Sequence, residues 1–296
     1  MKILLLGKDG QLGWELQRSL APLGELIALG PDTPGGDYAR LDEVERAVRS
    51  IAPDVIVNAG AHTAVDKAES EPELARQLNT LAPAMLASEA KRLGAWLVHY
   101  STDYVFDGSG STPWVETDAT SPLNVYGQTK AESEAAIQES GCQYLTFRTS
   151  WVYAARGGNF AKTMLRLGQE RDILTVIDDQ IGAPTGADLL ADVTAHALRT
   201  AQHRPEVTGL YHLVAGGETS WHGYARFVLD LAREYGMPLK VAPSAIKPVP
   251  TSAFPTPAER PRNSRLNTHK LQSTFGLTLP AWQTGVARML AEILEK

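Results

Sequence analysis

The sequence predicts an α/β fold, with a doubly wound parallel sheet of the Rossmann type and a smaller, interleaved α/β domain. Two observations predict this fold. Short apolar runs alternate with amphipathic helical segments through the first half of the chain, and three glycines follow the first of these runs directly. This alternation is typical of a parallel sheet covered by helices. The chain has 296 residues, which leaves room for a second unit, and its second half is less regular.

Five strands are predicted in the first half, each from a short apolar run. The runs are Ile3–Leu6, Leu26–Leu29, Val55–Asn58, Trp96–Tyr100 and Tyr144–Phe147. In a doubly wound sheet, ligands bind outside the carboxyl ends of such strands. The residues that follow each run are therefore the first candidates for a functional site.

The segments between these runs are predicted to be helices. Leu41, Val44, Val48 and Ile51 recur at the spacing of one helical face. The predicted helices of the first half are residues 13–20, 42–50, 72–93 and 125–139.

The second half contains further helices and one strand before a proline-rich segment. We expect helices over 160–169, 187–200, 220–235 and 282–295, and a strand over 210–214. Residues 248–261 include prolines at 248, 250, 255, 257 and 261, which suit neither a helix interior nor a central strand. We interpret this stiff segment as a wall of a ligand site, with an interdomain spacer as the alternative.

Composition and charge exclude several classes of protein. The formal net charge of −6 disfavours a nucleic-acid surface, and no apolar run approaches the length of a membrane span. Cys142 is the only cysteine, so no intrachain disulfide can form. We therefore expect a cytoplasmic protein in a reducing compartment, without nucleic-acid or membrane partners.

A glycine loop joins the first strand to the first helix. Gly7, Gly10 and Gly13 form a GxxGxxG pattern there. A dinucleotide site needs glycines at this place for a tight turn, for close approach of the backbone to a pyrophosphate, and for packing of the helix on the strand. The position of the loop predicts a nicotinamide dinucleotide as cofactor.

The choice between NADPH and NADH rests on the end of the second strand. An acidic residue there would bind the adenosine ribose of NADH, but Gly30 occupies the position, with Asp32 and Asp37 further on. Lys8 is close enough in sequence to meet a 2′-phosphate. The sequence allows both cofactors and favours NADPH.

Tyr126 and Lys130 are four residues apart, so they share one face of a predicted helix. A neighbouring ammonium favours phenolate and makes tyrosine a better proton donor. Without further context, a tyrosine and a lysine four residues apart on a helix are more typical of a solvated surface pair. The context favours catalysis, because Thr102 follows the fourth strand and offers a hydroxyl to the same substrate oxygen. Without Tyr126, a turn at Ser101–Asp103 would be the preferred interpretation.

These motifs together resemble the extended branch of the short-chain dehydrogenase/reductase superfamily, and within it the dTDP-4-dehydrorhamnose reductases. The resemblance spans nearly the whole chain and rests on residues 101–108, 122–127, 148–153, 159–160, 179–180, 182–185 and 262–266. It implies NAD(P)H-dependent reduction of the C4 keto group of dTDP-4-dehydro-L-rhamnose to dTDP-L-rhamnose, for cell-surface polysaccharide. Related dehydratases follow the threonine with an Asp-Glu pair, whereas Asp103 is followed here by Tyr104.

The resemblance also implies roles for individual residues. Tyr126, Lys130 and Thr102 would be catalytic, and Thr102, Asp103 and Trp151 would bind the sugar, although an aromatic residue at position 151 is equally typical of a core. Family members often carry an aspartate where Gly30 stands. The implied cofactor-binding residues are Gly7, Gly10, Gln11, Leu12, Gly13, Asp37, Tyr38, Ala61, His62, Thr63, Tyr100, Tyr126 and Lys130.

On this reading, residues 1–155 form the dinucleotide-binding domain, to which the chain returns around 185–216, and residues 156–296 form mainly the substrate domain. Some relatives dimerise around magnesium, and Glu15, Asp188 and Glu292 stand at the corresponding places. Solvated helix faces explain these acids equally well, so the homodimer and its ion stay open. Two other functions stay open as well: a reductase or epimerase of another nucleotide sugar, and a non-catalytic NADP-binding regulatory subunit.

Overall fold

A parallel sheet of six strands forms the centre of the molecule. The computed structural model describes all 296 residues, and its strand order is β10-β5-β4-β3-β1-β2, with every neighbouring pair parallel. The chain leaves β1 toward β2 and then crosses to β3, so the order reverses between β1 and β3. This confirms the predicted doubly wound α/β fold. The strands are β1 (Lys2–Leu6), β2 (Glu25–Leu29), β3 (Val55–Asn58), β4 (Trp96–Thr102), β5 (Gln143–Thr149) and β10 (Gly209–His212).

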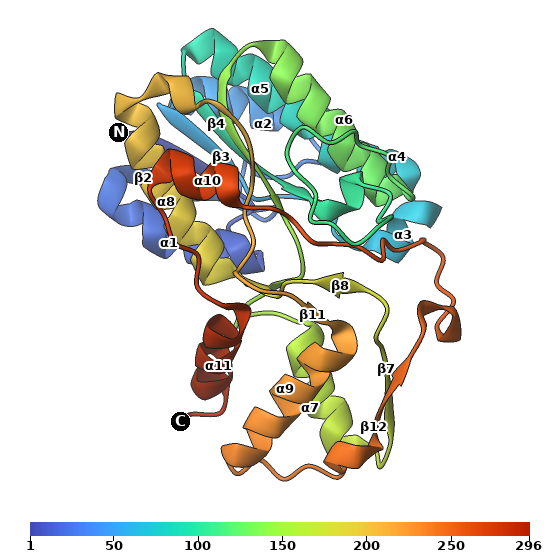
Figure 1. The fold of residues 1–296 in the computed structure, drawn as a ribbon. Coiled ribbons are helices and arrows are strands. Elements are labelled where there is room, and N and C mark those ends of the chain that lie inside the picture. The colour runs from blue at the N-terminus through green and yellow to red at the C-terminus, as the bar shows by residue number, and fades with distance from the viewer.

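Helices cover both faces of this sheet (Figure 1). Side chains alternate along β1: Ile3 and Leu5 pack in one core with α1 and α8, while Leu4 and Leu6 pack in another with α2, α5 and α6. Burial on both faces explains why these strands are continuous apolar runs. The covering helices are α1 (Gln11–Leu20), α2 (Leu41–Ile51), α3 (Val65–Ser70), α4 (Pro72–Arg76), α5 (Ala82–Leu93), α6 (Val125–Ser140), α8 (Ala187–His203) and α10 (His269–Phe275).

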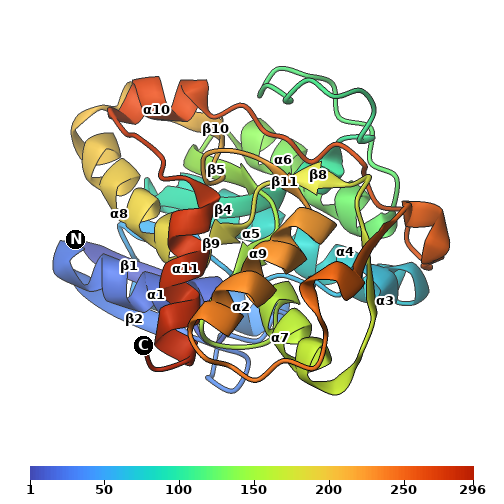
Figure 2. The ribbon, with the colours of Figure 1, turned by 60° about the horizontal axis from the view of Figure 1, so that its bottom comes forward.

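A smaller lobe lies beside the sheet, below it in Figure 1 and in front of it in Figure 2. Its core contains buried residues of three helices, among them Leu165, Tyr224 and Trp282. The lobe contains α7 (Phe160–Glu170), α9 (Trp221–Glu234), α11 (Trp282–Ile293), and the parallel pair β7 (Leu174–Ile177) and β12 (Ile246–Val249). Short strand pairs lie between lobe and sheet: β6 (Val152–Tyr153) with β9 (Thr185–Gly186), and β8 (Ile181–Gly182) with β11 (Thr219–Ser220).

The structure departs from the predicted elements at several places. The single helix predicted over 72–93 is interrupted by a π-helical stretch, Gln77–Leu81. Pro83 lacks the N–H that would donate to the carbonyl of Asn79, which explains why regular α-helix does not run through this region. α3, α10 and the strands of the smaller lobe were not predicted. Pro248 lies in β12, which is tolerated because that sheet has only two strands and both are edges.

None of the helices combines the length and the hydropathy required to cross a membrane.

Candidate active site

The glycine loop lies at the carboxyl end of β1. Gly7 has φ +86°, and a Cβ there would lie 2.5 Å from the backbone nitrogen of Gly60. A Cβ at Gly13 would lie 2.0 Å from the carbonyl oxygen of Gly7, so the absence of a side chain lets α1 pack onto the turn. Around Gly10 the nearest atom to such a Cβ is 3.6 Å away. The loop therefore leaves room at Gly10 and at the N-terminus of α1, as a bound pyrophosphate requires.

Two further predicted cofactor segments border this loop, and the π-helical stretch holds both. Gln77 Nε2 donates to the carbonyl oxygens of Tyr38 (2.9 Å) and Ala39 (3.0 Å). Asn79 Oδ1 accepts from the backbone N–H of His62 (2.8 Å), and its Nδ2 donates to the carbonyl oxygen of the same residue (3.1 Å). Gln77 and Asn79 therefore fix the backbone of two segments, one after β2 and one after β3. Their role was not predicted, because a regular helix would not present them together.

The end of β2 supports the sequence argument about the adenosine ribose. A Cβ at Gly30 would lie 2.0 Å from Asp9 Oδ2, so this position has no room for a side chain as the loop stands. Lys8 Nζ donates to Thr33 Oγ1 (3.0 Å), which places an ammonium beside the same turn.

Tyr126 and Lys130 lie on the first two turns of α6. Asn124 caps this helix, and its Oδ1 accepts from the backbone N–H of Gly127 (2.8 Å). A Cβ at Gly127 would lie 2.2 Å from the carbonyl oxygen of Tyr104, so the helix start packs tightly on the segment after β4. This contact brings Tyr126 beside Tyr104, with ring centroids 5.6 Å apart.

The catalytic candidates share one environment. Burial raises the pKa of Tyr126 to about 12, against a hydrogen bond with Thr102 that lowers it. Burial lowers the pKa of Lys130 to about 7, and the charge of Glu134 partly counteracts this shift. Lys130 Nζ lies 2.9 Å from His99 Nε2. The phenol is thus protonated near neutrality, and it can act as an acid only if its environment stabilises phenolate.

Asp103 is a buried carboxyl group with one free acceptor. Its Oδ1 accepts from Thr102 Oγ1 (3.1 Å), whereas its Oδ2 has no hydrogen-bond partner. Burial raises the pKa of Asp103 to about 6, and the neighbouring hydroxyl groups of Ser264 and Thr102 partly counteract this shift. An unpaired buried oxygen is costly, so this atom fits a hydroxyl group of a bound sugar.

Trp151 follows β5 with φ +49°, which is unusual for a residue other than glycine. Its ring is stacked on Trp221 of α9, with centroids 3.6 Å apart and planes at 14°. Strain of this kind is maintained only where the surrounding structure fixes it, and it is common at ligand sites.

A cavity of about 260 Å³ lies next to Tyr104. Its lining includes Phe160 and Trp221 from the smaller lobe and Phe254 and Arg260 from the proline-rich segment. Two residues of that segment therefore line a cavity, and a ligand in this cavity stays a prediction. Sequence analysis missed all four of these side chains, because only the fold brings them to Tyr104.

The proline-rich segment is fastened at both ends. Thr251 donates from its N–H (2.7 Å) and its Oγ1 (2.6 Å) to Asp179 Oδ1. Arg260 forms a bidentate ion pair with Asp66 on α3, with Nη2–Oδ2 at 2.7 Å and Nη1–Oδ1 at 3.0 Å. The segment thus bridges the smaller lobe and the sheet beside Tyr104.

Other predicted cofactor residues lie around the same edge, with partners of their own. Gln11 Oε1 accepts from Asn159 Nδ2 (3.3 Å), Tyr100 OH shares a hydrogen bond with Thr194 Oγ1 (2.7 Å) in the core, and Asp37 accepts from Arg40. The hydroxyl of Tyr100 is therefore bound to α8. Of the remaining members of the predicted set, Leu12 lies on the first turn of α1, and Ala61 and Thr63 flank His62 on the loop after β3.

The predicted metal ligands Glu15, Asp188 and Glu292 line one small cavity of about 30 Å³. They do not form a group that could hold a metal ion in this chain. Arg288 Nη1 donates to Asp188 Oδ2 (3.0 Å), so one of the three carboxylates already has a cationic partner.

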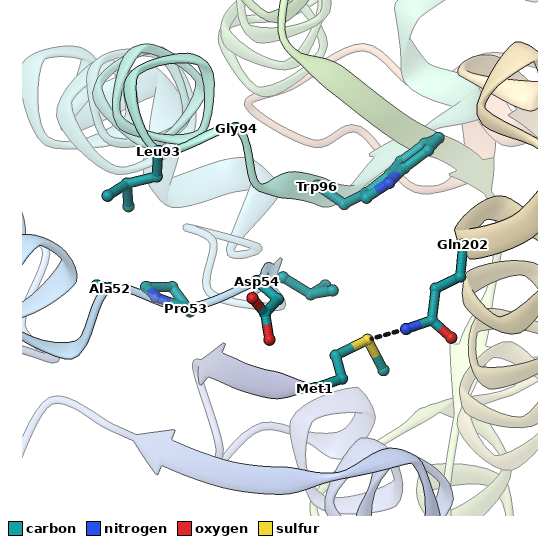
Figure 3. Close-up of a pocket in the computed structure, with 9 residues that line it drawn as sticks. Met1, Ala52, Pro53, Asp54, Leu93, Gly94, Trp96 and Gln202 are labelled. Atoms are coloured by element: carbon teal, nitrogen blue, oxygen red, sulfur yellow. Dashed lines mark hydrogen bonds between the residues drawn. The ribbon is translucent and has the colours of Figure 1, made fainter.

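A larger cavity, about 380 Å³, lies at the opposite edge of the sheet (Figure 3). Met1, Val55 and Trp96 in its lining mark the amino ends of β1, β3 and β4. Ligands of doubly wound sheets bind at the carboxyl ends, so this cavity is not the candidate active site.

Comparisons with known proteins test the family resemblance that the sequence motifs predict. Residues 1–295 match the model of the family described as RmlD substrate binding domain. A dTDP-4-dehydrorhamnose reductase of Salmonella typhimurium is 62% identical over 295 residues, which cover 99% of this chain and 98% of the relative. Two solved structures resemble the chain. A dTDP-4-dehydrorhamnose reductase from Clostridium acetobutylicum is 34% identical, with TM-score 0.88 and both chains covered in full. One from Bacillus anthracis in complex with NADP is 32% identical, with TM-score 0.87 and 98% and 99% coverage. These matches confirm the resemblance drawn from the motifs, and the chain belongs to the RmlD substrate binding domain family, the family of the dTDP-4-dehydrorhamnose reductases.

Proposed function

We propose that the protein is an oxidoreductase that reduces the C4 keto group of dTDP-4-dehydro-L-rhamnose, with NADPH or NADH, to give dTDP-L-rhamnose for cell-surface polysaccharide. One observation carries the proposal: the hydroxyl groups of Thr102, at the carboxyl end of β4, and Tyr126, at the start of α6, are hydrogen-bond partners, and Lys130 lies one turn further along α6. A keto reduction needs a hydride and a proton. The bound nicotinamide supplies the hydride, and the side chains at this edge supply the rest.

Each side chain has a role that follows from its surroundings. Tyr126 carries its proton near neutrality, so it donates that proton to the keto oxygen. Thr102 hydrogen-bonds the same oxygen, and a charged Lys130 stabilises the phenolate that remains. The free Oδ2 of Asp103 accepts from a sugar hydroxyl, and Trp151 offers a flat apolar surface to the ring.

The cavity beside Tyr104 is the proposed place for the rest of the sugar nucleotide. Phe160, Trp221 and Phe254 offer aromatic faces to a base, and Arg260 offers a cation to the phosphates. Residues 1–155, to which the chain returns around 185–216, are the proposed dinucleotide-binding domain, and residues 156–296 mainly form the proposed substrate domain.

NADPH is the proposed preferred cofactor. Lys8 is held at Thr33 by its ammonium group, and a 2′-phosphate there would gain an ion pair. Gly30 offers no carboxylate to a ribose hydroxyl, so NADH lacks the contact that this position often supplies.

The cytoplasm is the proposed compartment, because the lone cysteine, Cys142, is a buried free thiol. A homodimer around magnesium stays a prediction from the resemblance. It would require ligands from a second copy and release of Asp188 from Arg288.

The test is oxidation of NADPH and of NADH by dTDP-4-dehydro-L-rhamnose, with Tyr126→Phe as the matched variant. We expect turnover with the wild type and a loss of about 10²–10⁴-fold in kcat with the variant, which lacks only the acidic hydroxyl. NADPH should still bind to the variant, which would show that the variant is folded. Full activity of folded Tyr126→Phe would show that this proton donor is wrong. Cofactor binding without oxidation would instead indicate another nucleotide sugar as substrate or a regulatory subunit.

A further inference from the structure

A chain of buried polar side chains leads away from Lys130 into the sheet. Asn58 ends β3, His99 lies directly opposite it on β4, and Lys130 reaches down from α6. All three residues are at most 2% exposed. The proposed reduction gives Asn58 and His99 no role, yet burying three polar groups together requires that each be satisfied.

The orientation of Asn58 is fixed by its neighbours. Its Oδ1 accepts from the hydroxyl of Tyr38 (2.6 Å) and from the backbone N–H of Gly60 (3.2 Å). Because a backbone N–H only donates, the atom facing it must be the oxygen. Asn58 Nδ2 then faces His99 Nδ1 at 3.1 Å. An amide nitrogen donates as well, so Nδ1 of His99 accepts and carries no proton.

The tautomer of His99 follows from this contact. Burial keeps the pKa of His99 well below its ordinary value, so the ring is neutral. A neutral ring without a proton on Nδ1 carries it on Nε2. That atom lies 2.9 Å from Lys130 Nζ and 3.2 Å from Ser133 Oγ, whose own proton goes to the carbonyl oxygen of Lys130 (2.6 Å).

An N–H at this place favours one protonation state of Lys130, although Ser133 Oγ, at 3.2 Å, can also accept from it. An ammonium has three donors and no acceptor, so it cannot take the proton of His99 Nε2, whereas a neutral amine can. The surrounding charges agree. The carboxylate that would favour the ammonium, Glu134, is already held by Arg148 of β5, with Nη2–Oε2 at 2.6 Å and Nε–Oε1 at 2.9 Å. Burial lowers the pKa of Lys130 to about 7.

We propose that Asn58 and His99 are positioning residues that hold Lys130 as a neutral amine in the cofactor-free protein, and that Lys130 takes up a proton when the dinucleotide binds. The step rests on the proposed function, in which a charged Lys130 supports Tyr126. The proton comes from solvent and forms an N–H bond on Nζ. The negative charges of the bound dinucleotide favour the ammonium.

The first experiment reads the tautomer directly, without cofactor or substrate. Nitrogen-15 NMR of histidine-labelled protein distinguishes a proton on Nε2 from one on Nδ1, and His99→Gln assigns the signal among the seven histidines. We expect the Nε2–H tautomer, and no titration of His99 across the neutral range. The Nδ1–H tautomer, or a His99 that titrates near its ordinary value, would overturn the proposal.

Asn58→Asp reverses the direction of the hydrogen bonds between the three side chains without changing the shape of residue 58. A carboxylate at position 58 still accepts from Tyr38 and Gly60, but it also accepts from His99, which moves the ring proton to Nδ1. Nε2 then accepts from an ammonium. We expect the NMR tautomer to switch in Asn58→Asp and to stay unchanged in the matched variant Tyr38→Phe, in which Gly60 still orients Asn58. If Asn58→Asp fails to fold, the tautomer of His99 in the wild type still tests the proposal.

Proton uptake tests the second half of the proposal. Calorimetry of NADPH binding in buffers of different ionisation enthalpy counts the protons bound. About one pH unit above the pKa of Lys130, uptake by the wild type should approach one proton per NADPH, and uptake by Asn58→Asp should approach none. Equal uptake by both proteins would contradict the proposal. Catalytic failure with the uptake intact would count against the proposed function alone.

Discussion

Two glycines of the loop after β1 illustrate how differently single residues contribute. A methyl group at Gly13 would collide with the carbonyl oxygen of Gly7 at 2.0 Å, whereas at Gly10 the nearest atom is 3.6 Å away. Gly10 has φ −70°, which alanine adopts without strain. The absence of a side chain at Gly13 therefore allows α1 to pack on the turn, whereas at Gly10 it leaves space for a ligand.

We predict opposite effects for the two alanine variants. Gly13→Ala forces α1 away from the turn and should lower the free energy of unfolding by about 1–3 kcal/mol. Gly10→Ala should leave thermal stability nearly unchanged but weaken NADPH binding at least about tenfold, a loss of about 1.4 kcal/mol. Thermal unfolding and fluorescence titration with NADPH measure the two effects. Wild-type affinity in Gly10→Ala would mean that the pyrophosphate lies elsewhere.

At this scale, sequence reasoning reached the residues whose motifs are contiguous. Thr102, Tyr126 and Lys130 are recognisable from local context, and the structure places them at one edge. His99 belongs to none of the motifs from which the candidate site was predicted. Its role depends on Asn58, 41 residues away, and no local pattern indicates which strands become neighbours.

At the scale of elements, Glu89 joins two helices on one face of the sheet. This carboxylate of α5 accepts from Arg49 of α2 (2.8 and 3.1 Å) and from Arg92 (2.6 and 2.9 Å). Only 4% of its side chain is exposed. Hydrogen bonds from Arg49, and then from Arg92, lower the pKa of Glu89 to about 2.

We predict that Glu89→Gln lowers the free energy of unfolding by about 1–3 kcal/mol at neutral pH, because it leaves buried hydrogen bonds without their charge. A pKa lowered on folding stabilises the protein above the unfolded value, about 4.3, and this contribution is lost as pH falls toward 2. The difference in free energy of unfolding between wild type and Glu89→Gln should therefore narrow over that pH range, as measured by urea unfolding at a series of pH values. Glu45→Gln, which removes a more exposed partner of Arg49, is the control and should cost less than about 1 kcal/mol. A gap independent of pH would contradict the account.

Element positions were predictable where one apolar pattern continued, and less so where packing decided. The helix predicted over 72–93 is interrupted around Gln77–Leu81. Pro83 is a visible signal of the interruption, but the sequence does not show its consequence, that Gln77 and Asn79 hold the two segments predicted to bind the cofactor. β7 and β12 pair across about 70 residues. Thr175, Lys247 and Pro248 interrupt their apolar runs, so neither is a continuous apolar run of the kind from which the other strands were predicted.

At the scale of the whole molecule, the ion pair between Asp66 and Arg260 connects the proline-rich segment to the sheet side of the cavity. The side chains of Asp66 and Arg260 are 43% and 23% exposed, so solvent screens the pair and its contribution is modest. Its value lies in holding Phe254 and Arg260 over the proposed nucleotide site.

We predict that Asp66→Asn raises KM for the sugar nucleotide about two- to fivefold and leaves kcat nearly unchanged. A loss of about 0.5–1 kcal/mol in positioning corresponds to that range. Steady-state kinetics at varied concentrations of the sugar nucleotide measure KM and kcat separately. Asp42→Asn, which breaks an exposed ion pair with Arg46 on α2, is the control and should change neither constant. A fall in kcat at constant KM would show that Asp66 acts on the chemistry instead.

The order of strands in the sheet has a consequence for how the protein is made. β10 completes the sheet beside β5, and α8 covers α1, yet both follow residues 156–186 of the smaller lobe in the chain. A ribosome releases the chain from its N-terminus, so the edge of β5 and one face of α1 stay bare until residue 212 has emerged. Exposed strand edges and apolar helix faces promote aggregation. The sheet therefore cannot be completed before the first part of the smaller lobe has been made, and we expect a fragment that stops at residue 155 to aggregate.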